Sequence, residues 1–310
     1  MFEWTDDLAA LTPPFRGDGN PIKRKKLDAA AFLAPVATSL ASHVAPDYQP
    51  RASLVTLAST GKGSFADEAD ALIILGSTGL KGPFKGQLTV VPDADKLKIV
   101  NQGVDRWVEL YGTSGALEIF ALVGAWTPYP LLTVTPTMVL AMDRLRAHLA
   151  HASDYDAARA TAERLASTLP TAMTQWTQTY SGKHGGFEVL AYLFPDHHPF
   201  FDAAVTHVDT LPEARFGHLL GCVTSVADVE RITDRTSWHR YALVVVRSLR
   251  EAALPYLLAA AKTEPDSTGI ATALTAFGSA SAAAALASLG KPAKKIVAAY
   301  FAKHPTLATK

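Results

Sequence analysis

The side chains best able to carry out chemistry in this 310-residue chain are gathered between residues 196 and 209. Asp196, His197 and His198 are consecutive, and His207 and Asp209 follow a short distance along the chain. Imidazole nitrogens and carboxylate oxygens bind zinc and similar metals, and they transfer protons near neutral pH. One hypothesis is therefore a metal-dependent enzyme whose ligands are His197, His198 and His207, with a nearby carboxylate.

The same segment also has a purely structural interpretation. Prolines flank the two adjacent histidines, and the aromatic residues Phe194, Phe200 and Phe201 lie beside them. A turn between two helices, with Asp196 as a cap and the aromatic rings in the core, explains these residue types without any reaction. We favour this interpretation, so we expect no cofactor and assign no catalytic residue.

A second polar cluster lies at residues 231–240, at the entry to the C-terminal part of the chain. Arginine and tryptophan are residue types that often anchor protein–protein interfaces. A solvated connection between helices would explain the same charges. We take as the candidate partner-binding site the charged and aromatic members of this cluster, which are Arg231, Asp234, Arg235, Trp238, His239 and Arg240.

Three other stretches resemble nucleotide-binding or hydrolase motifs without matching them. The stretch ALIILGSTGLKG at 71–82 has the wrong glycine spacing for a dinucleotide fingerprint, and Pro83 follows where a helix should begin. The stretch STGKGS at 59–64 lacks the Ser or Thr that follows the lysine of a P-loop. His184 lies in a His-Gly-Gly sequence, but no G-x-S-x-G nucleophile elbow accompanies it. These differences argue against nucleotide binding and serine-hydrolase chemistry.

Composition limits the remaining classes of function. The 29 basic and 29 acidic residues give a formal net charge of zero, whereas a general nucleic-acid-binding protein is expected to carry a basic excess. The single cysteine, Cys222, cannot form an internal disulfide and fits a reducing compartment. The first residues are acidic, and no uncharged apolar run is long enough to cross a membrane. We therefore expect a cytoplasmic protein without membrane association.

The elements that must position the polar clusters are predicted to be helices. From 238 to 308, apolar residues recur at intervals of three and four, which places them on one side of five successive short helices. Breaks at Glu264-Pro265-Asp266, Gly278 and Gly290 separate these helices. The pattern predicts an all-α fold of stacked helix pairs, a HEAT-like α-solenoid.

The rest of the chain divides into three regions. Residues 1–30 form an irregular N-terminal arm, 31–136 an N-terminal helical region and 137–310 the HEAT-like repeats. A helix is predicted from Asp154 to Leu169, with Ser153 capping its start. The sequence also allows one small β-hairpin near 87–100, where β-branched residues lie on both sides of a Pro-Asp turn.

The stretch 254–308, LPYLLAAAKTEPDSTGIATALTAFGSASAAAALASLGKPAKKIVAAYFAKHPTLA, resembles the helical-repeat region of bacterial MolR-like proteins, a family named after a molybdate metabolism regulator. The similarity lies in a helix that ends at His304-Pro305 and follows a break at Gly290-Lys291. The resemblance implies stacked helices and is compatible with a regulatory role.

These features predict a non-enzymatic helical-repeat scaffold that binds a protein partner, because stacked helices expose a long surface and need no catalytic group. The metal-dependent enzyme built on the histidines is the first alternative. Association with nucleic acid, through Lys23–Lys26 and the arginines near Trp238, is the second alternative, although the balanced charge argues against it.

Overall fold

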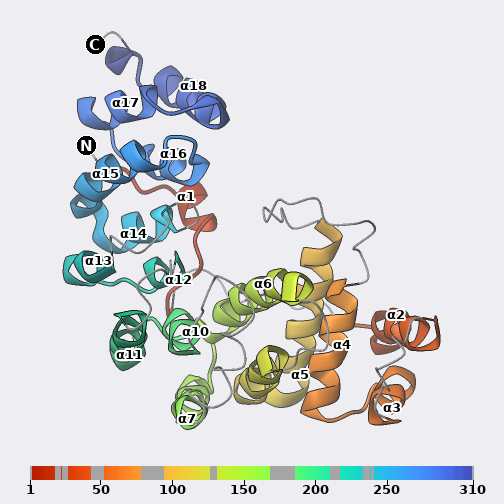
Figure 1. Cartoon of the computed structure of the whole chain (residues 1–310). Coiled ribbons are helices and arrows are strands. Elements are labelled where there is room, and N and C mark those ends of the chain that lie inside the picture. Colours follow the sequence, from red (N-terminus) through yellow and green to blue (C-terminus); the bar gives the residue numbers. More distant parts are fainter. Residues whose placement is uncertain are drawn as a thin grey trace. The chain divides into compact units, whose positions relative to one another are not determined.

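The computed structural model describes residues 2–17, 22, 27–42, 52–77, 94–125, 131–167, 186–209, 217–232, 238 and 241–308. Within these residues the regular structure consists of helices, short 3-10 turns and one isolated bridge between Phe2 and Phe277. The chain is all-α, as the sequence predicts. It forms two compact units, whose helices are labelled in Figure 1. Unit 1 comprises Met1–Pro13 with Phe187–Lys310, and unit 2 comprises Pro14–Gly186.

In unit 2, α5 is the central helix, and α4, α6 and α7 pack against it. Trp107 of α5 is buried among these helices. A further apolar cluster, which includes Leu33, Leu57 and Ile74, joins α2, α3 and α4. The bounds of the helices described in unit 2 are α2 (Ala29–Ser42), α3 (Ala52–Thr60), α4 (Phe65–Ser77), α5 (Ala94–Ala125), α6 (Leu131–Leu149) and α7 (Tyr155–Ala166).

Gly112 interrupts α5 with a backbone conformation of φ 69° and ψ −179°. The interruption frees the backbone N–H of Thr113, which donates to Asp154 Oδ2 at 3.0 Å, while the Thr113 hydroxyl donates to Oδ1 at 2.5 Å. Asp154 is the N-cap residue of α7, but its side chain makes no capping hydrogen bond to that helix. The predicted cap by Ser153 is therefore wrong, because the N-cap position falls one residue later, at Asp154. The Asp154 carboxylate accepts hydrogen bonds from Thr113 of α5 and not from the start of its own helix.

The predicted β-hairpin near 87–100 is wrong over its second half. Residues 94–100 form the start of α5, and no strand occurs in the described part of the chain. The reason is the spacing of Val100, Val104 and Trp107, which are all buried on one side of α5. Burial at helical intervals outweighs the preference of β-branched residues for strands. Residues 87–93 lie outside the described residues.

Unit 1 contains the five C-terminal helices that the sequence predicts, preceded by the helices described within residues 186–232 and by α1 in the N-terminal arm. The breaks between the five helices also fall where they are predicted, at Pro265, Gly278 and Gly290. The bounds in unit 1 are α1 (Asp6–Ala10), α10 (Gly186–Leu193), α11 (His198–Asp209), α12 (Gly217–Leu220), α13 (Val226–Ile232), α14 (Ala242–Leu249), α15 (Leu254–Thr263), α16 (Thr268–Leu274), α17 (Ala280–Ala287) and α18 (Lys294–Lys303).

The last five helices pack in alternation, so that α14 contacts α16, α16 contacts α18, and α15 contacts α17. In Figure 1 these helices follow one another in layers along the blue part of the ribbon. Ala260, Ala271, Ala273 and Ala283 are buried between them, where a small side chain lets two helices approach closely. None of the helices in the described part is both long and apolar enough to cross a membrane.

The helices α15 (Leu254–Thr263) and α18 (Lys294–Lys303) have the same length and correspond to one another at an offset of 40 residues. Each follows a short 3-10 turn whose last residue, Ala253 or Ala293, is fully buried. Each ends at a residue with nearly the same backbone angles, φ −125° and ψ 62° at Glu264 against φ −125° and ψ 64° at His304. A proline follows in both cases. The two helices therefore have the same length, the same type of turn before them and the same backbone conformation at their C-terminal end.

Candidate functional site

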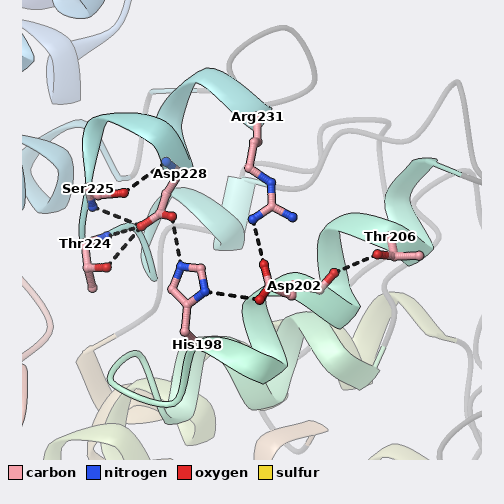
Figure 2. A network of polar contacts seen from close by, with 7 residues as sticks. All are labelled: His198, Asp202, Thr206, Thr224, Ser225, Asp228 and Arg231. Carbon is pink, nitrogen blue, oxygen red and sulfur yellow. Dashed lines mark hydrogen bonds and ion pairs between the residues drawn. The ribbon is translucent and has the colours of Figure 1, made fainter.

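Two residues from the predicted sites, His198 and Arg231, are joined in one polar network between α11 and α13 (Figure 2). His198 Nδ1 lies 3.2 Å from Asp202 Oδ2, and its Nε2 lies 2.9 Å from Asp228 Oδ1. Arg231 Nη1 donates to Asp202 Oδ1 at 2.7 Å. The histidine thus connects a carboxylate of its own helix with one of the neighbouring helix.

Asp228 is the buried end of this network, with 4% of its side chain exposed. Its Oδ2 accepts hydrogen bonds from the backbone N–H groups of Thr224 and Ser225 at 2.8 and 2.9 Å, and from the Thr224 hydroxyl at 3.0 Å. In return the Ser225 hydroxyl accepts from the Asp228 backbone N–H at 3.2 Å. This reciprocal pair is a capping box that fixes the start of α13 and the position of the carboxylate.

The local sequence of α13 explains why the network faces solvent. Val229 and Ile232 are buried, so they set the inner side of this short helix. Val226 and Arg231 fall on exposed positions, and Val226 is 36% exposed although it is apolar. The result is a surface patch of exposed charges, and the buried carboxylate of Asp228 fixes the position of His198 within it. We refer to His198, Asp202 and Arg231 as the α11–α13 patch.

The charge state of His198 follows from its two carboxylate neighbours. The hydrogen bond to Asp228 and, more weakly, that to Asp202 raise the pKa of the imidazole above its ordinary value of 6.5, although partial burial acts in the opposite direction. Because both ring nitrogens face carboxylate oxygens, the doubly protonated imidazolium satisfies the geometry best.

The two carboxylates are held in the charged form. The pKa of Asp202 is lowered from 3.8, first by the hydrogen bond from Arg231 and then by that from His198. Burial acts to raise the pKa of Asp228, but the hydrogen bonds from Thr224, His198 and Ser225 outweigh it, and the pKa is lowered. Near neutral pH the patch therefore carries fixed charges of both signs at defined positions.

The histidines proposed as metal ligands have different surroundings. His197 packs its ring edge-on against Phe200, with ring centroids 4.5 Å apart. His198 directs both ring nitrogens at carboxylates. His207 belongs to α11, but its side chain is outside the described residues. Within the described part of the chain no three His, Cys, Asp or Glu side chains are arranged to hold a metal ion, and the hypothesis that involves His207 stays a prediction.

The two described members of the predicted partner-binding site, Arg231 and Trp238, have different surroundings. Arg231 is exposed and lies over the ring of Phe201, with 5.4 Å between the guanidinium carbon and the ring centroid. Trp238 is buried, its backbone N–H donates to Glu264 Oε1 at 3.0 Å, and its carbonyl accepts from the backbone N–H of Ala242 at the start of α14. Its indole therefore belongs to the core of unit 1. The other four members, Asp234, Arg235, His239 and Arg240, lie outside the described residues.

Sequence reasoning missed Asp202, Thr224, Ser225 and Asp228, which complete the network. Two patterns could have found them. His198 and Asp202 are four residues apart, which places them on the same side of one helix. Ser225 and Asp228 have the spacing of a capping box directly before the apolar positions of α13. The approach of α11 to α13 has no such signature, because it depends on packing between separate segments.

Unit 2 contains a second histidine network, which is largely buried. Asp105 of α5 accepts from Arg144 Nε and Nη2 at 2.7 Å each, and His148 Nε2 lies 2.7 Å from Asp105 Oδ1. Burial acts to raise the pKa of Asp105, but the hydrogen bonds from His148 and Arg144 lower it overall. These contacts join α5 to α6 and account for the polar groups without a ligand.

Comparison of the chain with protein-family models, with curated proteins and with solved structures found no match.

Proposed function

We propose that this chain is a non-enzymatic helical-repeat scaffold that binds a protein partner through the α11–α13 patch. The observation that carries the proposal is that exposed charged side chains are held in place by a buried carboxylate. His198, Asp202 and Arg231 are each between 40% and 52% exposed, while Asp228, which anchors them, is 4% exposed. Side chains fixed in this way lose little conformational entropy when a partner binds.

The composition of the patch favours a protein over other partners. Both signs of charge are present within a few ångströms, whereas a surface that binds phosphates requires mainly positive charge. Arginine, here positioned by Asp202 and Phe201, is a residue type enriched at the centre of protein–protein interfaces.

The proposal extends to the architecture of unit 1, which we infer to be a short HEAT-like α-solenoid related to MolR-like proteins. The 40-residue correspondence between α15 and α18 supports this inference, as does the alternating contact of α14 to α18. Stacked helix pairs hold their exposed side chains on a rigid support, which suits a binding role.

Affinity capture from a lysate of the source cells tests the proposed function, using the full chain, nuclease treatment and identification by mass spectrometry. We expect a discrete protein to be retained after nuclease treatment by the wild type and to be lost with Arg231→Glu. The matched control is Lys262→Glu, which makes the same charge change at an exposed position on α15. It should retain the protein.

Two results would contradict the proposal. Loss of every captured species after nuclease treatment would support the nucleic-acid alternative. Equal retention by Arg231→Glu and the wild type would remove the α11–α13 patch from the interface. Elemental analysis of the purified chain tests the remaining alternative, because stoichiometric zinc, manganese or iron would favour the enzyme.

A further inference from the structure

The N-terminal segment 2–13 belongs to unit 1, and its first residues, which precede α1, contact the rest of this unit as an extended peptide would. Phe2 forms an antiparallel bridge with Phe277, and the Glu3 N–H donates to the Ala276 carbonyl at 2.8 Å. The rings of Phe2 and Phe277 also pack together, with centroids 5.3 Å apart and an interplanar angle of 54°. Backbone pairing combined with an aromatic contact is how many proteins hold an extended segment.

The segment is held at both ends. Near its start, the Glu3 carboxylate accepts from Lys303 Nζ of α18 at 2.8 Å. Near its end, Arg247 Nη1 of α14 donates to the Thr12 hydroxyl at 2.9 Å and to the Pro13 carbonyl at 3.1 Å. The Lys303 contact lowers the pKa of Glu3, through its hydrogen bond and its positive charge.

The three attachment points belong to one side of the helix stack. Lys303 lies on α18, Phe277 follows α16 and Arg247 lies on α14, and these three helices pack on one another in that order. Figure 1 shows the red segment with α1 running beside α14 and α16. We call the surface formed by Arg247, Phe277 and Lys303 the α14–α18 face.

The contacts at the start of the segment are of a kind that can be exchanged. Lys303 and Glu3 are 58% and 52% exposed, and ion pairs between exposed side chains contribute little to stability. The short helix α1, capped by the Thr5 hydroxyl, has a single buried residue, Leu8. A competing peptide with the same features therefore has few buried contacts to displace.

We propose that the α14–α18 face is a peptide-binding surface, and that the N-terminal segment occupies it until a partner replaces it. The partner is a protein with an extended segment in which an aromatic residue is followed directly by an acidic residue. The aromatic ring takes the place of Phe2 against Phe277, and the acidic group takes the place of Glu3 beside Lys303. This inference is independent of the α11–α13 patch, because the two surfaces share no residue.

A labelled synthetic peptide with the sequence of residues 1–13 tests the proposal against the full-length chain. The protein that binds the peptide, which we call the receiver, is the full-length chain with Phe2→Ala and Glu3→Ala. These two changes weaken the attachment of its own N-terminal segment and leave the residues of the α14–α18 face unchanged. We expect the receiver to bind the peptide about tenfold more tightly than the wild type does, since the lost aromatic contact of Phe2 is worth on the order of a tenfold change and the exposed ion pair of Glu3 adds little. Phe2→Ala in the peptide should reduce binding by a similar factor.

Charge reversal decides whether the binding is specific. The receiver with Lys303→Glu should lose affinity for the wild-type peptide and regain it for a peptide with Glu3→Lys. The receiver with Lys262→Glu, an exposed position on α15, should bind the wild-type peptide unchanged. Circular dichroism and thermal melting establish that each variant is folded.

Three results would overturn the proposal. The first is a folded receiver that binds the peptide no better than the wild type. The second is a Lys303→Glu receiver that does not distinguish the two peptide charges. The third is dimerisation of the wild type that Phe2→Ala abolishes, because the occupant would then be the segment of a second copy.

Discussion

At the scale of single residues, Asp228 connects the start of α13 to the exposed charges above it. Its carboxylate accepts from Thr224 and Ser225 at the helix start and from His198 of α11. Removing it leaves the two backbone N–H groups without their acceptor and His198 without its buried counter-charge. The residue therefore contributes both to the stability of α13 and to the geometry of the patch.

We predict that Asp228→Ala lowers the free energy of unfolding by about 2 kcal/mol, which combines the loss of a helix cap with the loss of a buried acceptor. Chemical denaturation of purified protein measures this. Asp202→Ala, which removes an exposed member of the same network, should cost less than about 1 kcal/mol. Equal effects of the two variants would show that Asp228 does not anchor the network.

The stability contributed by His198 should depend on pH. Its pKa is raised in the folded chain, so its contribution is complete below the unfolded value of about 6.5 and is lost as pH rises through the folded value. Asp202 and Asp228 have lowered pKa values, so both remain charged above about pH 4. The groups that face the imidazole in the described residues are these two carboxylates, with Arg231 behind Asp202.

We therefore predict that His198→Asn destabilises the chain most between about pH 4 and 6.5, and that the difference from the wild type shrinks at higher pH. Denaturation at a series of pH values measures the difference, and NMR titration of the imidazole measures its pKa directly. An imidazole pKa below 6.5, or a difference that grows above neutral pH, would contradict the assignment.

The residues of the patch could be predicted from the sequence only in part. His198 and Arg231 stand out because of their types, yet the sequence assigns them to two separate hypotheses, a metal site and a partner site. Their connection through Asp202 depends on side-chain contacts between α11 and α13, and nothing in the spacing of the sequence encodes that approach. Trp238 has a residue type typical of interfaces, but its place at the start of α14 puts it in the core.

At the scale of elements, the five C-terminal helices were predictable because glycine and proline mark their ends. The hairpin near 87–100 was not, because β-branched residues such as Ile99 and Val100 favour strands locally, whereas the burial of Val100, Val104 and Trp107 at helical intervals requires a helix. The kink at Gly112 was also missed. A glycine within an apolar helical pattern is compatible with both a straight helix and a break.

We predict that Gly112→Ala destabilises unit 2 by about 1–3 kcal/mol, because its φ of 69° with a ψ of −179° is a conformation that residues with a Cβ avoid. A Cβ there would also lie 3.1 Å from Asp154 Oδ2, close to the hydrogen bonds that Thr113 makes. Thermal unfolding measures the effect. An unchanged melting temperature would mean that α5 can straighten at this point.

The correspondence between α15 and α18 makes a paired prediction. Ala253 and Ala293 are both fully buried at the entry of these helices, so a leucine at either position should overpack the stack and cost about 1–3 kcal/mol. Ala259 and Ala299, also 40 residues apart, are both exposed, and leucine there should change stability by less than about 0.5 kcal/mol. Denaturation of the four variants checks the register, and a buried pair that behaves like the exposed pair would refute it.

At the scale of the whole molecule, the chain forms unit 2 from a continuous stretch and unit 1 from two stretches that flank it. The sequence predicts an irregular arm for residues 1–30, but it could not show that residues 2–13 contact residues that follow 235 to 300 positions later, because such contacts leave no periodic pattern. Unit 1 therefore has two surfaces at which named side chains are held in position. They are the α14–α18 face, which the N-terminal segment covers, and the α11–α13 patch.

The most direct test of partner binding is site-specific photo-crosslinking of the full chain in its own cells. A photoreactive residue at Ala227, exposed on α13 beside the patch, is compared with one at Ala259, exposed on α15. We predict a single protein adduct from position 227 that Arg231→Glu abolishes, and no such adduct from position 259. Adducts with nucleic acid alone, or the same adducts from both positions, would contradict the account.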